Sequence, residues 1–158
     1  MQVSLPGHSV NAAFLQELKD SHLELVQTLQ QLRQLCSDET APTDVAAQAG
    51  KLLQLLRDYL SVQFSLEETY GYVRCPANMH VALQAKTKQA LFQHNLLYVS
   101  LVELSERVDN MQYRGTLERD IGEVKSDLKA FLGALHEHES LEQEMIQIAY
   151  GSRYQPSS

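Results

Sequence analysis

Two polar residues interrupt an apolar helical pattern near the end of the chain. Apolar residues recur every three or four positions from about Ile121 to Ala149, as in a helix packed lengthwise against other helices. His138 and Glu142 occupy two inward positions of that pattern, one turn apart, so their side chains point to the same place. Because a buried carboxylate without a partner is costly, we expect a further group or a cation beside them.

Loop signals divide the chain into four predicted helices. Pro42, Gly71, Pro76 and Gly115 mark the breaks between apolar periodic stretches. The predicted helices span residues 11–36, a start between 43 and 51 to 70, 79–111, and 121–149. Connections this short favour an all-α fold, an up-down-up-down antiparallel four-helix bundle. We expect three regions: a loose lead-in over 1–10, the bundle over 11–150 and a frayed tail over 151–158.

Every predicted helix carries a polar residue on its inward face. The set is His22 from the first helix, Gln63 and Glu67 from the second, His94 from the third, and His138 and Glu142 from the fourth. Imidazoles and carboxylates that converge in a bundle are a common way to build a non-haem metal site, and these donors suit iron, manganese or zinc. A cation would also relieve the repulsion between two buried carboxylates. The alternative is a metal-free hydrogen-bonded network of the same residues.

Other residues that could do chemistry are weaker candidates. His136 should point away from His138 and be exposed, because two residues turn a helix by about 200°. His80 could approach the site only if its loop folds inward. The segment from Tyr70 to Tyr72 is expected to pack at a bundle end, and Tyr98 to lie in the core.

Composition limits the partners and the compartment. The formal net charge is −7 and no basic stripe is visible, so we expect no nucleic-acid partner. We also expect no signal peptide and no membrane span. Cys36 and Cys75 are predicted at opposite ends of the bundle, too far apart for a disulfide. A reducing compartment, the cytoplasm, follows as an expectation.

Four segments of the chain resemble the hemerythrin-like (HHE cation-binding) domain family. They are ELKDSHLELVQTL around His22, VQFSLEETYGYV around Gln63 and Glu67, ALFQHNLLYVSLVEL around His94, and FLGALHEHESLEQEMIQIAY around His138 and Glu142. The resemblance covers residues 15–150 and implies a four-helix bundle around a non-haem di-iron centre. It also implies proteins that bind oxygen, sense oxygen or redox state, handle iron or respond to nitric oxide.

The ligand set of that family is incomplete in this sequence. The resemblance implies five histidines and two carboxylates, of which His22, Glu67, His94, His138 and Glu142 have counterparts here. A glutamine, residue 63, and an alanine, residue 90, stand where the family has two further histidines. An amide carbonyl is a weak, neutral ligand for a transition metal. Reversible oxygen carriage is therefore not expected; a one-ion site, a water-rich two-ion site and a lost site remain open.

Three functions follow as hypotheses. The first is a hemerythrin-like protein that binds one or two iron ions, or manganese or zinc, and responds to redox state, dioxygen or nitric oxide without being an enzyme. The second is an enzyme that oxidises iron or reduces peroxide at an open metal position. The third is a metal-free helical bundle that acts as an interaction module. The sequence leaves the oligomeric state open.

Overall fold

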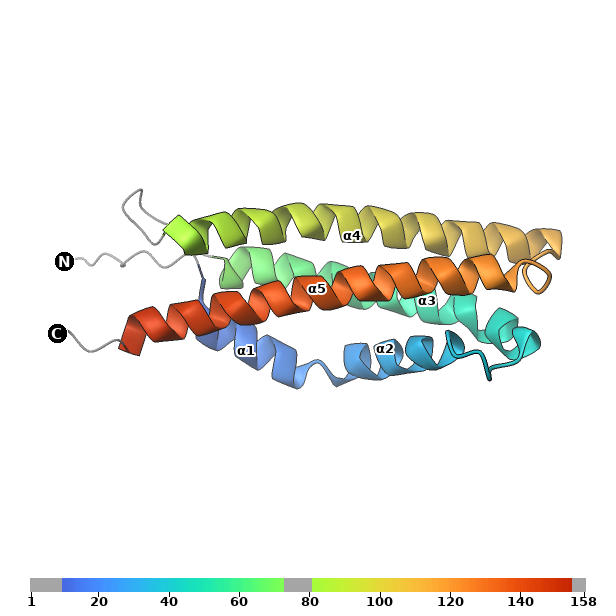
Figure 1. The fold of residues 1–158 in the computed structure, drawn as a ribbon, viewed down its shortest axis with the longest axis horizontal. Coiled ribbons are helices and arrows are strands. Elements are labelled where there is room, and N and C mark those ends of the chain that lie inside the picture. The colour runs from blue at the N-terminus through green and yellow to red at the C-terminus, as the bar shows by residue number, and fades with distance from the viewer. Residues whose placement is uncertain (1–9, 73–80, 155–158) are drawn as a thin grey trace. The chain divides into compact units, whose positions relative to one another are not determined.

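The computed structural model of the chain describes residues 10–72 and 81–154, with side chains up to Gly151. Over these residues the chain is helical and contains no strand (Figure 1). Its elements are α1 (Ala12–Ser21), α2 (Leu23–Leu35), α3 (Pro42–Leu66), η1 (Glu67–Gly71), α4 (Val81–Arg114) and α5 (Ile121–Tyr154). The prediction of an all-α fold is confirmed.

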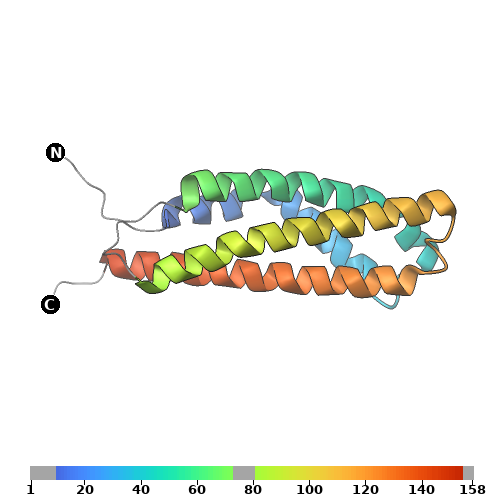
Figure 2. The same cartoon turned by 90° about the horizontal axis from the view of Figure 1, so that it is seen from above.

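The helices contribute to two compact units. Within the described chain the first unit contains residues 10–21, 62–72, 81–94 and 137–154, and the second contains His22–Ser61 and Asn95–His136. The long helices α4 and α5 run unbroken through both stretches of sequence (Figure 2). Of the predicted site residues, all except His22 belong to the first unit.

The core of the first unit is apolar and joins residues of α1, α4 and α5 with Val10 and Tyr72. Leu15 of α1, Leu83 and Ala90 of α4 and Met145 of α5 are completely buried. The whole cluster is Val10, Ala12, Leu15, Tyr72, Leu83, Ala90, Leu141, Met145, Ile146 and Ala149. On α5 the steps from Leu141 to Ala149 follow the four-residue spacing of one helix face. This apolar packing fixes the helices that carry the polar residues described below.

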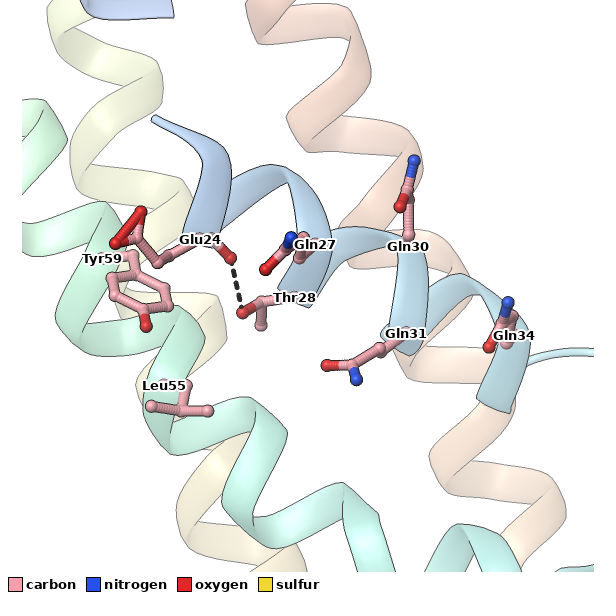
Figure 3. A pocket seen from close by; sticks show the side chains of 8 residues that line it. All are labelled: Glu24, Gln27, Thr28, Gln30, Gln31, Gln34, Leu55 and Tyr59. Atoms are coloured by element: carbon pink, nitrogen blue, oxygen red, sulfur yellow. Dashed lines mark hydrogen bonds between the residues drawn. The ribbon is translucent and has the colours of Figure 1, made fainter. Parts of the chain in front are cut away.

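The second unit buries rows of leucine and valine, and it carries a polar hollow on α2 and α3. The hollow is lined by Glu24, Gln27, Thr28, Gln30, Gln31, Gln34, Leu55 and Tyr59 (Figure 3). Thr28 Oγ1 donates a hydrogen bond to the backbone oxygen of Glu24 at 2.8 Å. None of the predicted metal ligands lines this hollow.

The first predicted helix is broken at His22, so the prediction of one continuous helix over 11–36 was wrong. His22 lies between α1 and α2 with φ −93° and ψ 64°, outside the helical region. Its carbonyl accepts the hydrogen bond from Val26 N at 3.2 Å and so begins α2. Asp20, Ser21 and His22 are all weak helix formers, and the Ser21 hydroxyl bonds back to Leu18 O, which explains a break here.

Residues that favour helix ends lie at the start of α1 and after the end of α4. Asn11 Oδ1 accepts a hydrogen bond from Phe14 N at 3.2 Å, so Asn11 is the N-cap of α1. Gly115 follows α4 with φ +74°, a left-handed conformation that favours glycine after a helix. None of the helices in the described part of the chain is long and apolar enough to cross a bilayer.

The inward register of α4 differs from the prediction around His94. Tyr98 was expected in the core, but Tyr98 and Leu91 are each 36% exposed. Ala90 and Leu97 are buried instead, at spacings of four and three residues from His94. His94 itself is buried as expected, so α4 presents His94 inward with small or aliphatic neighbours.

Candidate metal centre

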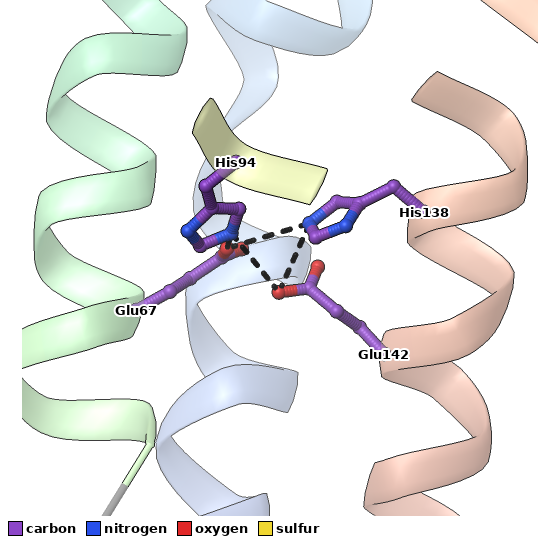
Figure 4. A group of neighbouring side chains, drawn as sticks. All are labelled: Glu67, His94, His138 and Glu142. Atoms are coloured by element: carbon purple, nitrogen blue, oxygen red, sulfur yellow. Dashed lines mark hydrogen bonds and ion pairs between the residues drawn. The ribbon is translucent and has the colours of Figure 1, made fainter. Parts of the chain in front are cut away.

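Four buried side chains of the first unit converge on one point. Glu67 of η1, His94 of α4, and His138 and Glu142 of α5 each bring one nitrogen or oxygen atom within 4.8 Å of the others (Figure 4). None of the four is more than 2% exposed. A group of two imidazoles and two carboxylates in this arrangement is a set that could hold a metal ion.

The distances between these atoms suit one ion at their centre. His94 Nε2 lies 2.9 Å from Glu67 Oε1 and 3.9 Å from Glu142 Oε2. His138 Nε2 lies 3.5 Å from Glu142 Oε2 and 4.0 Å from Glu67 Oε1. Ligands about 2.1 Å from an ion are roughly 3 Å apart when adjacent and about 4.2 Å apart when opposite. The observed separations fall in that range.

The outer nitrogen of each imidazole is held by an oxygen acceptor. His94 Nδ1 lies 2.6 Å from Glu68 Oε2, and His138 Nδ1 lies 2.7 Å from Gln93 Oε1. Because both oxygens can only accept, each Nδ1 carries the hydrogen, and in the neutral rings the Nε2 lone pairs face the centre. Such outer contacts are typical of histidines that bind metals.

One atom at the centre lacks a hydrogen bond. His138 Nε2 is the only buried side-chain nitrogen or oxygen in the described residues without a hydrogen-bond partner. Buried polar atoms nearly always have a hydrogen-bond partner, so a buried nitrogen without one is unusual. A cation at the centre of the four residues would use the His138 Nε2 lone pair, and the donor set therefore fits a metal.

A π-helical turn begins at Glu67. The backbone N–H of Tyr72 donates to Glu67 O at 2.7 Å, a five-residue step in place of the usual four. Such π turns are rare and occur often at functional sites. Gln63, one turn before, donates from Nε2 to Glu67 Oε2 at 3.2 Å. In the structure Gln63 thus holds the carboxylate of Glu67 in position.

An aromatic ring shields the imidazoles. Phe64 stacks on His94 with ring centroids 4.0 Å apart and lies edge-on to His138 at 5.5 Å. Phe64 is buried and follows directly after Gln63 on α3. The contacts restrict both rings and keep water from one side of the site.

Helix α1 brings a lysine to the site. Lys19 Nζ donates to Glu142 Oε1 at 2.9 Å, and the Lys19 side chain is only 16% exposed. His22, the residue expected from this part of the chain, starts the second unit, where its ring lies edge-on to Tyr59 at 5.7 Å. Lys19 follows Leu15 by one helical turn, and this spacing is the signal that could have revealed it.

Tyr72 packs in the apolar core, and its hydroxyl also reaches the centre of the site, a contact that the sequence analysis did not predict. Its hydroxyl donates to Glu142 Oε2 and lies 3.5 Å from Glu67 Oε1 and 3.3 Å from His94 Nε2. Tyr72 is 7% exposed, whereas Tyr70 is exposed. Ordinary helical spacing cannot place Tyr72 beside Glu67, because it lies five residues away across the π turn.

Comparison with known families gives one result. The profile of the hemerythrin HHE cation binding domain matches residues 13–147, most of the chain. The chain belongs to the hemerythrin family. No curated protein and no solved structure gives a significant match. The predicted family and the predicted all-α bundle of the hemerythrin type are thereby confirmed. Together, the hemerythrin domain and the four buried donors indicate a metal-binding protein.

The buried ionisable groups of this hemerythrin domain shift one another's pKa values. Burial by itself would raise the pKa of Glu142, but contacts with His138, His94 and Glu67 and the charge of Lys19 hold it well below its usual value. Burial raises the pKa of Glu67. Burial would lower the pKa of His94, but its carboxylate neighbours outweigh burial and raise it to about 9. The carboxylates therefore attract positive charge to the centre.

The structure shows the burial of three further residues that the sequence analysis considered. Ala90 is completely buried in the apolar core of the first unit and offers no donor. His136 is exposed, as expected. Cys36 is buried. His80 and Cys75 lie outside the described residues, so nothing tests the predictions made for them.

Proposed function

We propose that this hemerythrin domain binds a single non-haem iron ion through Glu67, His94, His138 and Glu142. The observation that carries the proposal is the orphaned His138 Nε2, which faces the two carboxylates with its Nδ1 held by Gln93. The donor atoms of Glu67, His94 and Glu142 contact one another or Tyr72, so His138 Nε2 is the one of the four donors without a hydrogen bond. Manganese and zinc suit the same donors and are the competing ions.

One ion fits the donor set better than two. A second ion would need further nitrogen or oxygen donors, but Ala90 offers none and the amide oxygen of Gln63 is only a weak, neutral ligand. His22 is not among the converging donors of the described residues. Lys19 meanwhile supplies a positive charge to Glu142, the charge that a second cation would otherwise bring.

The proposed role is a response to redox state, dioxygen or nitric oxide. A bound iron supplies a one-electron redox couple and a Lewis-acidic position for a small diatomic molecule. The chain contributes a buried site, with Phe64 packed on the two imidazoles. Cytoplasmic location and a non-enzymatic role stay predictions from the sequence.

A metal-free interaction module is the second candidate, and one observation favours it. Lys19 and Tyr72 both donate to Glu142, so the site satisfies most of its polar atoms without a cation. This candidate predicts that chelators leave the melting temperature unchanged. A metal-bound domain is instead stabilised by its ion, by about 2.7 kcal/mol when free metal exceeds the dissociation constant a hundredfold.

Anaerobic reconstitution with ferrous iron tests the proposal. We expect about one iron per chain after desalting, measured by elemental analysis with manganese and zinc counted in parallel. His138→Ala should lose the iron, and His136→Ala, an exposed histidine on the same helix, should keep it. A wild-type protein that retains no metal of any kind would leave only the metal-free candidate.

A further inference from the structure

We propose that Tyr72 is a fifth protein ligand of the bound ion, through its phenolate oxygen, and that it selects the ferric state. This inference rests on the proposed iron-binding function and names a further residue of the same site. It concerns the one hydroxyl that the described residues place among the four donors.

The hydroxyl oxygen of Tyr72 contacts three of the four donors. It hydrogen-bonds to Glu142 Oε2, and it lies 3.3 Å from His94 Nε2 and 3.5 Å from Glu67 Oε1. These separations resemble the spacing of His94 and Glu67 to each other, which is 2.9 Å. Adjacent ligands of one ion are roughly 3 Å apart, so the Tyr72 oxygen occupies the place of a ligand rather than that of an outer contact.

The backbone holds Tyr72 in this place firmly. Its N–H closes the π turn on Glu67 O, and Gly71 O accepts a hydrogen bond from Asn11 N at 2.6 Å. A Cβ on Gly71 would lie 2.4 Å from Leu15 Cδ2, so glycine allows α1 to pack against this turn. The Tyr72 ring also lies nearly parallel to His94, with centroids 5.4 Å apart. The hydroxyl is therefore preorganised towards the centre.

A neutral phenol satisfies its surroundings poorly. The hydroxyl has one hydrogen to donate, while Glu67 and Glu142 both present acceptor oxygens to it. A phenol that donates to Glu142 has no hydrogen of its own left for Glu67 Oε1, which lies 3.5 Å away. An ion bound by all three oxygens removes this conflict, because each oxygen then faces a positive charge.

The charges balance with a ferric ion and a phenolate. Fe³⁺ and the Lys19 ammonium bring four positive charges. Glu67, Glu142, a Tyr72 phenolate and Glu68, which contacts His94 Nδ1, bring four negative charges. Binding then follows Tyr–OH + Fe³⁺ → Tyr–O⁻–Fe³⁺ + H⁺, with the proton released to water and no electron transferred.

Spectroscopy of the ferric-loaded protein tests this ligand directly. A phenolate bound to ferric iron gives a visible charge-transfer band and tyrosinate ring modes in the resonance Raman spectrum. We expect both in the wild-type protein and complete loss of both in Tyr72→Phe. Tyr70→Phe is the matched control, because Tyr70 is exposed two residues earlier, and it should keep the band. Tyr72→Phe should also bind ferric iron at least about tenfold more weakly.

The outcomes separate this inference from the proposed function. Wild-type protein that holds ferric iron but shows neither band nor tyrosinate modes would overturn the Tyr72 ligand and leave iron binding intact. Protein that binds zinc but no ferric iron would overturn the selection of the ferric state. If its ultraviolet difference spectrum also lacked tyrosinate ionisation, the Tyr72 ligand would be overturned as well. Protein that binds neither ion would overturn both proposals.

Discussion

Lys19 and Glu142 form an ion pair in the first unit, with 2.9 Å between Lys19 Nζ and Glu142 Oε1. Glu142 is completely buried and Lys19 nearly so. Removal of one partner from a buried pair leaves an uncompensated charge. The stability of the metal-free domain therefore depends on Lys19 of α1.

Lys19→Met should destabilise the metal-free domain by about 3 kcal/mol, because Glu142 loses the ammonium that balances it. Urea unfolding in the presence of a chelator measures this loss. The loss should shrink in iron-loaded protein, since the ion also balances Glu142. Lys86→Met is the control, because Lys86 pairs with Glu144 at the surface and should change stability by less than about 1 kcal/mol. Equal losses for the two variants would contradict the account.

Gln93→Leu should weaken metal binding about 10- to 100-fold, because His138 Nδ1 loses the oxygen that orients the ring. Competition against a chelator of known affinity measures the change. Gln89→Leu, one turn earlier on α4 and exposed, should bind as tightly as wild type. A Gln93→Leu variant with unchanged affinity would mean that the Gln93 contact does not support a ligand.

Gln63→His should tighten iron binding, by about tenfold or more, because an imidazole replaces a weak amide donor beside Glu67. Anaerobic titration with ferrous iron measures the gain. Gln143→His adds a histidine at an exposed position beside Glu142 and should give none. Absence of any gain in Gln63→His would show that position 63 serves only to hold Glu67.

Gly71→Ala should destabilise the domain by about 1–3 kcal/mol, because the new Cβ meets Leu15 Cδ2 at 2.4 Å. Thermal unfolding measures the loss. In a Leu15→Ala background the same substitution should cost less, since the clashing atom is gone. Gly133→Ala, with no atom within 4 Å of the new Cβ, should be neutral or stabilising. Additive losses in the double variant would rule out the Leu15 contact as the cause.

Helical periodicity was sufficient to find Glu67, His94, His138 and Glu142 as inward polar residues. Each lies on a stretch that is regular enough for the spacing of three and four residues to hold, and the structure brings all four together. Because the neighbouring inward positions are apolar, these four polar residues stood out in the pattern. The structure does not by itself test their role as ligands, which stays a proposal.

The residues that the sequence did not reveal lie at irregular backbone. The break at His22 ends one helical register and starts another. A single register over residues 11–36 therefore does not predict that Lys19 reaches the site. The π turn from Glu67 shifts Tyr72 by one residue relative to an α-helix, and a pattern of three and four steps cannot predict that shift. On α4 Tyr98 was expected in the core, whereas the structure buries Ala90, a small residue that gives a weak apolar signal.

The most direct test is a crystal structure of the iron-loaded protein with anomalous diffraction measured above and below the iron absorption edge. The account predicts one anomalous peak per chain, about 2.1 Å from Glu67, His94, His138 and Glu142 donor atoms. A peak elsewhere, two peaks at the site, or no peak in protein that carries iron by elemental analysis would contradict it.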